Sequence, residues 1–285
     1  MSDALILAFD SGGTKTAWAT FNEDLRLQET GQYPTPEDLQ EYLDTMRTLI
    51  EKHAVKVVGL GVAGTISTDH TTVLVSPNIP YLNGVNLEEA LGNEEVLVKV
   101  DNDARCALIG EVIAGAAQSD TSVVLITIGT GIGGAVMQKG VVLPHPQDVS
   151  EEIGRIVVDP NDAFQSPTGR GTVESFIGGK NVENRFGIKL HDIAEKVRLG
   201  DPKSKQVWEQ ISYYFLQSLR AIHMVYSCRE IIIGGIGAAD LEYYLQGEAP
   251  CRVIPAKLGV QAALYGAGRL ALDRYHEELA DPLDE

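Results

Sequence analysis

The pattern of apolar and polar positions predicts an α/β protein whose two halves begin alike. Residues 4–9 form a short apolar run that ends in the glycine-rich segment 10–16, and residues 17–21 resume the apolar pattern. The same order of strand, glycine turn and second strand recurs over residues 122–143. Apolar runs separated by glycine turns are typical of paired β-strands. The repeat therefore predicts a duplicated fold.

Stretches with helical periodicity separate the predicted strands. Thr35 followed by Pro36 predicts the start of a helix with one apolar face. Asn86 and Glu89 have the spacing of a capping box. Further helices are expected over residues 104–117, 202–222 and 261–279.

Polar and glycine residues follow several predicted strands directly. Asn102 and Asp103 come after the strand expected over residues 95–101, and Gly234 follows the strand expected over residues 230–233. Sites in open α/β sheets gather at the carboxyl ends of strands, so we expect functional residues at these positions. Residues 144–172 show no clear periodicity, and an irregular stretch of this length is usually kept for function.

The charge and cysteine content narrow the classes of function. The chain has 23 basic and 40 acidic residues, a formal net charge of −17, which disfavours binding to nucleic acid or to an anionic membrane. No apolar run reaches the length of a bilayer span, and the first ten residues lack the basic flank of a secretory signal, so a cytoplasmic protein is expected. Cys106, Cys228 and Cys251 are scattered without C-x-x-C spacing. This spacing predicts neither a disulfide framework nor a cysteine zinc site.

The two glycine segments are candidates for phosphate binding. Gly129, Gly131, Gly133 and Gly134 lack the Cβ atoms that would keep an anion away from backbone N–H groups, and Thr130 adds a hydroxyl group. An ordinary hairpin turn could also use such glycines. The second segment of the same kind, residues 10–16, favours the phosphate-binding interpretation.

Five motifs in this order resemble the ROK family of sugar kinases, within the actin, Hsp70 and hexokinase fold. The motifs are Asp10-x-Gly-Gly-Thr-Lys, Asn102-Asp103, Gly129-Thr-Gly-x-Gly-Gly, Glu152-Ile-Gly and Gly234-Gly-x-Gly. The resemblance implies a two-lobed ribonuclease-H-like fold with duplicated βββαβα cores and a cleft between the lobes. We expect an N-terminal lobe over residues 1–118 and a C-terminal lobe over residues 119–285. The helix near residues 262–280 is expected to pack back on the N-terminal lobe.

The resemblance implies ATP and Mg²⁺ as cofactors. It assigns Asp10 to organising Mg²⁺, the first loop to the β- and γ-phosphates, and the segment from Gly234 to Gly237 to the adenosine. A structural alternative for Asp10 is a turn residue at a strand end. The implied nucleotide-binding residues are Asp10, Gly12, Gly13, Thr14, Lys15, Gly129, Thr130, Gly131, Gly133, Gly234, Gly235 and Gly237.

The resemblance implies that Asp103 is the catalytic base. Phosphoryl transfer needs an acceptor hydroxyl that is aligned with the leaving oxygen and loses its proton, and a carboxylate can perform both tasks. Asn102 would hold sugar hydroxyls beside it. The alternative is that either residue is an ordinary helix N-cap.

Further sugar contacts are implied at Asn78, Glu152, Arg155 and Glu174. Asn78 lies in a segment similar to the sugar loop of the family, although Tyr81 replaces the usual tryptophan. Arg155 replaces a histidine that normally contacts the sugar, so we expect weak activity on glucose and a shift toward glucose in Arg155→His. The alternatives are a turn asparagine and solvated surface charges.

The zinc-binding cysteine segment of the family is absent, and Thr172 stands where its last cysteine would be. We therefore expect no structural zinc. This departure leaves the implied fold unchanged, because some members of the family lack the segment.

These features predict an ATP-dependent kinase that phosphorylates a hydroxyl of a hexose or an N-acylhexosamine. One alternative is a sugar-sensing ROK regulator, although we expect this acidic chain, which begins directly on the first strand, to lack the DNA-binding part of such a regulator. Another is an ATPase of the BadF or N-acetylglucosamine-kinase type, whose opening motif resembles residues 10–16. The three cysteines are poorly placed to bridge an iron–sulfur cluster, as the activators of that type do. The sequence names neither the sugar nor the phosphoryl donor, and it leaves open whether the protein is a homodimer.

Overall fold

The computed structural model describes residues 6–93, 95–117, 122–143, 153–235, 245 and 248–280. The chain divides into two compact units. The first unit contains the described residues up to Gly115 together with those from Val260 onward, and the second contains the described residues from Ala116 to Gly259. None of the helices in the described part of the chain is long and apolar enough to cross a membrane.

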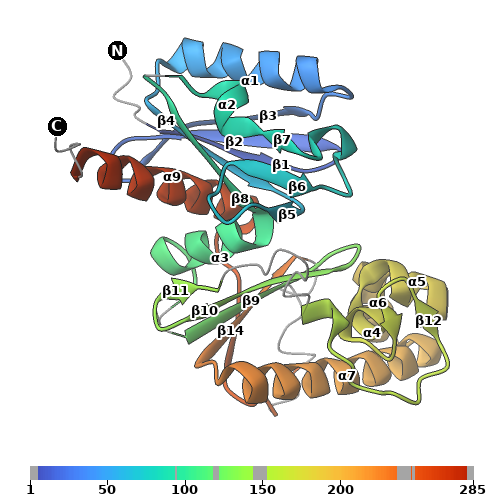
Figure 1. Ribbon diagram of the computed structural model, residues 1–285. Helices are drawn as coiled ribbons and strands as arrows, with labels where there is room; N and C mark the ends of the chain where they lie inside the picture. Colours follow the sequence, from blue (N-terminus) through green and yellow to red (C-terminus); the bar gives the residue numbers. More distant parts are fainter. Residues whose placement is uncertain are drawn as a thin grey trace. The chain divides into compact units, whose positions relative to one another are not determined.

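The first unit is built on a five-stranded sheet with the order β3-β2-β1-β4-β8 (Figure 1). β1, β4 and β8 are parallel, whereas β2 is antiparallel to both β1 and β3. The strands are β1 (Ile6–Ser11), β2 (Lys15–Phe21), β3 (Leu27–Pro34), β4 (Val57–Val62) and β8 (Leu97–Asn102). The helices are α1 (Leu39–His53), α2 (Leu87–Leu91), α3 (Asp103–Ile113) and α9 (Ala262–Ala280). A small sheet of β5 (Thr65–Ile66), β6 (Thr72–Val75) and β7 (Val85–Asn86), with the 3₁₀ turn Pro80–Leu82, lies between β4 and β8 in the chain.

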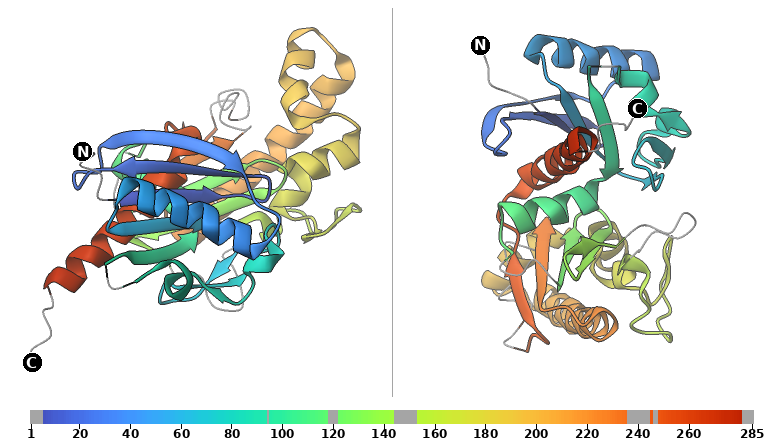
Figure 2. Two further views of the ribbon diagram at one scale, coloured as in Figure 1. Left: turned by 90° about the horizontal axis from the view of Figure 1, so that it is seen from above. Right: turned by 60° about the vertical axis from the view of Figure 1, so that its left-hand side comes forward.

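The alternation of side chains along β1 explains the layers of this unit. Leu7 and Phe9 belong to the apolar cluster that includes α1, whereas Ile6 and Ala8 belong to the cluster that includes α9. Figure 2 shows α9 running along the strands of this sheet. A Cβ atom on Gly59 would lie 2.0 Å from the carbonyl oxygen of Ala267, so the close approach of α9 to β4 requires a glycine at this position.

The second unit repeats the topology of the first. Its five-stranded sheet has the order β11-β10-β9-β14-β15. β9, β14 and β15 are parallel, and β10 is antiparallel to β9 and β11, as in the first sheet. The strands are β9 (Ser122–Ile128), β10 (Ile132–Gln138), β11 (Val141–Val142), β14 (Glu230–Gly235) and β15 (Arg252–Pro255). The duplication predicted from the sequence is confirmed.

Helices cover one face of the second sheet. Trp208, Ile211 and Phe215 of α7 join Ile126 and Ile231 in one apolar cluster. The helices are α4 (Val173–Ile177), α5 (Gly179–Phe186), α6 (Leu190–Arg198) and α7 (Pro202–Tyr226). The described part of segment 144–172 forms the 3₁₀ turn Ile153–Arg155 and the short hairpin of β12 (Gln165–Ser166) and β13 (Gly169–Arg170), and the 3₁₀ turn Gly259–Gln261 precedes α9.

Most of the predicted helix starts are confirmed, and one is wrong. Asn86 accepts a hydrogen bond from the N–H of Glu89 at the start of α2, as expected. The first helix is capped by Asp38 instead of Thr35. The Thr35 hydroxyl donates to the carbonyl oxygen of Gly12 at 2.6 Å, so it binds the first glycine loop instead of capping the helix.

Candidate functional site

The first glycine loop is held by hydroxyl groups. The N–H of Gly12 donates to the carbonyl oxygen of Lys15 at 3.0 Å, which closes the turn between β1 and β2. Thr35 binds the carbonyl oxygen of Gly12 and also contacts the hydroxyl of Thr16 at 3.0 Å. The Ser11 hydroxyl lies 2.8 Å from the hydroxyl of Tyr42 in α1. These bonds fix the backbone of the loop, while Gly13, Thr14 and Lys15 remain exposed.

The sheet register places Asp10 near Asp103. Asp10 pairs with Gly61 across β1 and β4, and Gly61 pairs with Asp101 across β4 and β8. Asp103 follows β8 as the first residue of α3. A Cβ atom on Gly61 would lie 3.6 Å from the Cα atom of Asp103. Gly61, which the sequence reasoning did not select, therefore lies next to the backbone of both residues.

The two carboxylates have different electrostatic surroundings. Burial, together with the negative charge of Asp103, raises the pKa of Asp10 from 3.8 to about 7, although Lys15 acts to lower it. Burial also raises the pKa of Asp103, but the backbone amides of Asp103 and Ala104 and the side chain of Asn102 act to lower it. Amides at the start of α3 thus favour the charged form of Asp103. A cation next to Asp10 would relieve the repulsion between the two groups.

Hydrogen bonds within the protein occupy most of the side chain of Asn102. Its Oδ1 accepts from the N–H groups of Ala104 and Arg105 at 2.9 and 3.2 Å, so Asn102 is the N-cap of α3. Its Nδ2 donates to the carbonyl oxygen of Gly64 at 3.0 Å. An amide side chain has two N–H groups, so a contact between Asn102 and a ligand would have to use the remaining one. Because the cap is Asn102, Asp103 is not needed in that role.

The loop that carries Asn78 lies against the first glycine loop. A Cβ atom on Gly13 would lie 2.9 Å from the carbonyl oxygen of Asn78. Ser76 holds this loop, because its hydroxyl donates to the carbonyl oxygen of Ala63 at 2.8 Å and its N–H donates to Asn83 Oδ1 at 2.7 Å. The first unit therefore places side by side the segments that contain Asp10, Asn78, Asn102 and Asp103.

The second glycine turn, Gly129 to Gly131, is held by backbone bonds. The N–H groups of Gly179 and Lys180, at the start of α5, donate to the carbonyl oxygens of Gly129 and Thr130, each at 2.9 Å. The C=O and N–H groups of a trans peptide point in opposite directions, so the N–H groups of Thr130 and Gly131 are directed away from α5. A Cβ atom on Gly129 would have no neighbour within 4 Å. This geometry is suited to an approaching anion.

Glu174 supports this turn directly. Its Oε2 accepts from the N–H of Ile132 at 2.8 Å, and a Cβ atom on Gly131 would lie 2.5 Å from the same oxygen. Gly133 lies in β10, where it pairs with Thr127. Packing explains why position 134 is a glycine, because a Cβ atom there would lie 2.6 Å from Cδ1 of Ile153.

The end of β14 lies beside the second glycine turn. Gly234 pairs with Thr127 and Gly235 pairs with Ile128 in the parallel ladder, so these glycines share one sheet edge with Gly129. Gly235 has a φ of 72°. A Cβ atom there would also lie 2.2 Å from the carbonyl oxygen of Ile128, so only glycine fits.

The remaining predicted residues divide into two groups. Arg155 ends a 3₁₀ turn of the second unit and its side chain is exposed. Glu152 and Gly237 lie outside the described residues. The sequence reasoning also missed Asp101, a buried residue whose Oδ1 accepts from Nε of Arg105 at 2.8 Å at the base of α3. Asp101 lies in β8 and Arg105 in α3, so the helix spacing rule does not predict this pair, which forms at the junction of the two elements.

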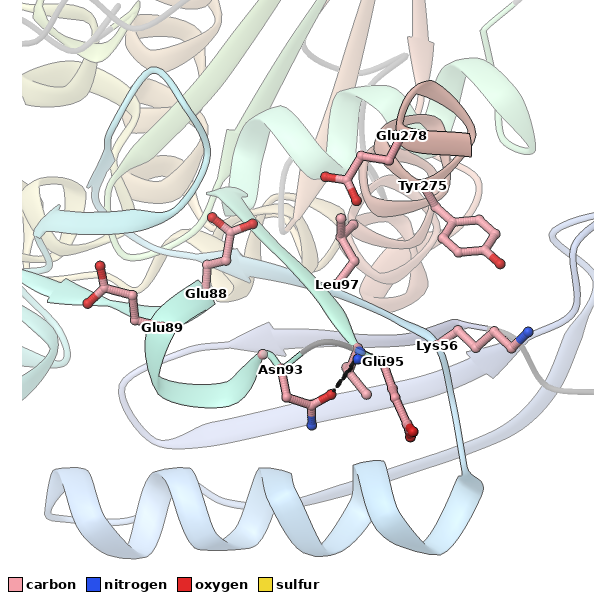
Figure 3. Close-up of a pocket in the computed structure, with 10 residues that line it drawn as sticks. Lys56, Glu88, Glu89, Asn93, Glu95, Leu97, Tyr275 and Glu278 are labelled. Carbon is pink, nitrogen blue, oxygen red and sulfur yellow. Dashed lines mark hydrogen bonds between the residues drawn. The ribbon is translucent and has the colours of Figure 1, made fainter. Parts of the chain in front are cut away.

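A surface cavity of the first unit lies away from Asp103. Figure 3 shows Glu88, Glu95 and Glu278 around it, with Lys56 at its edge. Leu97, which begins β8, also lines the cavity, whereas Asp103 follows the other end of that strand. The excess of carboxylates makes this cavity unsuitable for a nucleotide phosphate.

Comparison with known proteins identifies relatives along almost the whole chain. The ROK family model matches residues 6–274. The N-acetyl-D-glucosamine kinase of Vibrio parahaemolyticus is 28% identical over 92% of this chain and 98% of its own length.

Solved structures support the same relationship. The ROK hexokinase of Thermus thermophilus has a TM-score of 0.81 and 26% identity, and the match covers 95% of this chain and 99% of that protein. A ROK glucokinase of Streptomyces griseus, solved with glucose and AMPPNP, has a TM-score of 0.74 and 26% identity over 94% of this chain and 99% of its own.

Proposed function

Because the chain belongs to the ROK family, we propose that it is an ATP-dependent sugar kinase that transfers the γ-phosphoryl group to a hydroxyl of a hexose or an N-acylhexosamine. The observation that carries the proposal is the pair Asp10 and Asp103 at the carboxyl ends of parallel strands, with α3 amides acting on Asp103. The relatives named for N-acetylglucosamine and glucose support this class of substrate.

We assign the role of general base to Asp103. Burial raises the pKa of Asp103 and the amides at the start of α3 counteract that rise; in its ionised form Asp103 can accept the proton of a sugar hydroxyl as the new P–O bond forms. Asn102 holds the start of α3 and the strand end in place through its bonds to Ala104 and Gly64. Asn78 would contribute to the sugar site from the loop that rests on Gly13.

Asp10 is the residue suited to Mg²⁺. Its carboxylate is a hard oxygen ligand, and the repulsion from Asp103 that raises its pKa would be reduced by a nearby cation. When bound, Mg²⁺ would neutralise charge on the transferring phosphates. Residues 12–15 of the first loop would approach the phosphates, with Lys15 as their cation.

The second unit supplies backbone groups for the nucleotide. We assign the N–H groups of Thr130 and Gly131 to the phosphates, since α5 binds the carbonyl oxygens of the turn. Gly234 and Gly235 would border the adenosine, because they lie on the same sheet edge as the turn. Glu174 would hold the turn through Ile132, and a contact between Glu174 and the sugar stays a prediction. Glu152 and Gly237 are assigned from the resemblance alone.

A coupled ADP-release assay tests the proposal. Glucose, mannose, allose, fructose, N-acetylglucosamine and N-acetylmannosamine would be screened with ATP and with polyphosphate, each with Mg²⁺ and with EDTA. We expect Mg²⁺-dependent turnover of at least one sugar with ATP. Asp24→Asn, which removes an exposed carboxylate of the first unit, is the matched control and should match the parent. Sugar binding without turnover would contradict the kinase and favour a sugar sensor, whereas ADP release that needs no sugar would favour an ATPase.

A further inference from the structure

Two of the three cysteines, which the sequence spacing presents as unrelated, lie together with a histidine in the second unit. The group consists of His223, Cys228 and Cys251, and one potential ligand atom from each lies within 4.8 Å of the other two. Sγ of Cys228 is 4.0 Å from Nδ1 of His223. Cys228 is buried, and His223 and Cys251 are partly buried. Cys106 belongs to the first unit and takes no part.

The fold fixes the three residues from separate segments. His223 lies in the last turn of α7, and Ser227 ends that helix in the left-handed conformation, with a φ of 49°. The chain therefore turns back at Cys228, whose carbonyl oxygen lies 3.0 Å from Nδ1 of His223. Cys251 comes directly before β15, and the ion pair of Arg252 with Glu230, at 3.0 Å, locks β15 to β14.

Two thiols and one imidazole supply three of the four ligands of a tetrahedral zinc site, and water would take the fourth position. Zn²⁺ binds thiolate sulfur and histidine nitrogen in a tetrahedral arrangement, in which neighbouring ligand atoms are roughly 3.5–3.8 Å apart. Side-chain movements of about 1 Å would bring the present atoms to that spacing. Soft sulfur ligands disfavour Mg²⁺, so this group does not compete for the cation proposed at Asp10.

We propose that His223, Cys228 and Cys251 form a zinc site that ties the end of α7 to the starts of β14 and β15. These strands run parallel to β9, so the site lies at the sheet edge opposite to Gly129 and Gly235. It is therefore separate from the proposed nucleotide groups, and its role is to stabilise the second unit. It also differs in position from the cysteine segment in which the family resemblance places structural zinc, since that segment ends at Thr172.

Cobalt substitution of the full-length, reduced protein tests this site. Co²⁺ reports thiolate coordination by a charge-transfer band in the near ultraviolet, and its visible bands report tetrahedral geometry. We expect one Co²⁺ per chain, displaced by Zn²⁺. Cys251→Ser and Cys228→Ser should lose the charge-transfer band or weaken it sharply, and His223→Gln should change the visible bands. Cys106→Ser is the matched control, because it removes a thiol of the first unit, and it should bind like the parent.

Affinity and stability provide a second measurement. In competition with a chromophoric chelator, Cys251→Ser should bind Zn²⁺ at least about 100-fold more weakly, because loss of a ligand should exceed the 10- to 100-fold effect of a lost outer partner. Saturating Zn²⁺ should raise the Tm of the parent and of Cys106→Ser, but not that of Cys251→Ser. Circular dichroism identifies any variant that fails to fold, and Cys251→Ala then replaces it.

Two results would overturn the proposal. The first is equal zinc affinity in the parent and in folded Cys251→Ser. The second is a combination of two findings for the parent: a single titratable thiol when it is purified without reductant, and no zinc binding after reduction. Cys228 and Cys251 would then form a disulfide. Neither result affects the kinase, because the sugar assay reads a different part of the molecule.

Discussion

The two glycine loops follow the same strand order but are stabilised and charged in different ways. The first loop contains Asp10 and Lys15, and hydroxyl groups of Thr35 and Ser11 anchor it. The second turn contains no charged residue. It is held by the backbone of α5 and by the carboxylate of Glu174.

This difference indicates a division of labour within a duplicated fold. The first unit has the carboxylates that can bind a cation and accept a proton, so its residues should govern the chemical step. The second unit offers neutral backbone N–H groups, whose direction depends on the residues that hold the turn. Substitutions in the first unit should therefore change kcat, and those in the second should change KM for ATP.

The largest expected effect is that of Asp103→Asn. The amide preserves the shape of the side chain but cannot take a proton, so kcat should fall by about 10²–10⁴-fold while sugar binding survives. Calorimetric binding of the sugar and steady-state kinetics measure the two quantities, with Asp24→Asn as control. If binding and turnover fall together, Asp103 acts in the structure of α3 instead.

The second prediction concerns Asp10→Asn in EDTA. The raised pKa means that protonation of Asp10 favours the folded state: this stabilisation is complete below about pH 3.8 and is lost as the pH rises through about 7. Removing the charge should raise the free energy of unfolding by about 4 kcal/mol at pH 8 and by less at pH 5, whereas in a separate assay with Mg²⁺ the variant should lose activity. Urea unfolding at both pH values measures this. A gain that does not depend on pH would show that folding does not raise the pKa of Asp10.

The third prediction concerns Glu174→Ala in the second unit. Loss of the bond to Ile132 should lower the free energy of unfolding by about 1–3 kcal/mol and raise KM for ATP, with KM for the sugar unchanged. Glu174→Gln, which can still accept the bond, should retain most of both. An increase in KM for the sugar alone would instead assign Glu174 to the sugar site.

The smallest expected effect is that of Arg155→His. Its side chain is exposed, and exposed charged groups contribute at most about 1 kcal/mol, so the preference between glucose and other sugars should shift toward glucose by about fivefold or less. kcat/KM across the sugar panel measures this shift. Identical preferences in parent and variant would remove Arg155 from the sugar site.

Local patterns in the sequence determined much of the fold. Apolar runs separated by glycine turns in residues 4–21 and 122–143 predicted the two opening hairpins, and the ordered motifs predicted the family and the duplicated α/β fold, which are confirmed. The same local chemistry predicted the cap at Asn86. It failed at Thr35, because the hydroxyl of that residue binds Gly12, which is distant in sequence and adjacent only after folding.

Only the tertiary structure decided which residues meet. Asp10 lies near Asp103 because parallel strands far apart in the chain are in register, and Glu174 reaches Ile132 because the segments around α4 and β10 pack together. His223, Cys228 and Cys251 show the same limit, since their spacing in the chain has no metal-binding pattern. Hydrophobic periodicity and glycine turns act over a few residues, so the sequence by itself determined the elements and their order. Contacts between distant segments depend on strand register and helix packing, so they became visible only in the folded chain.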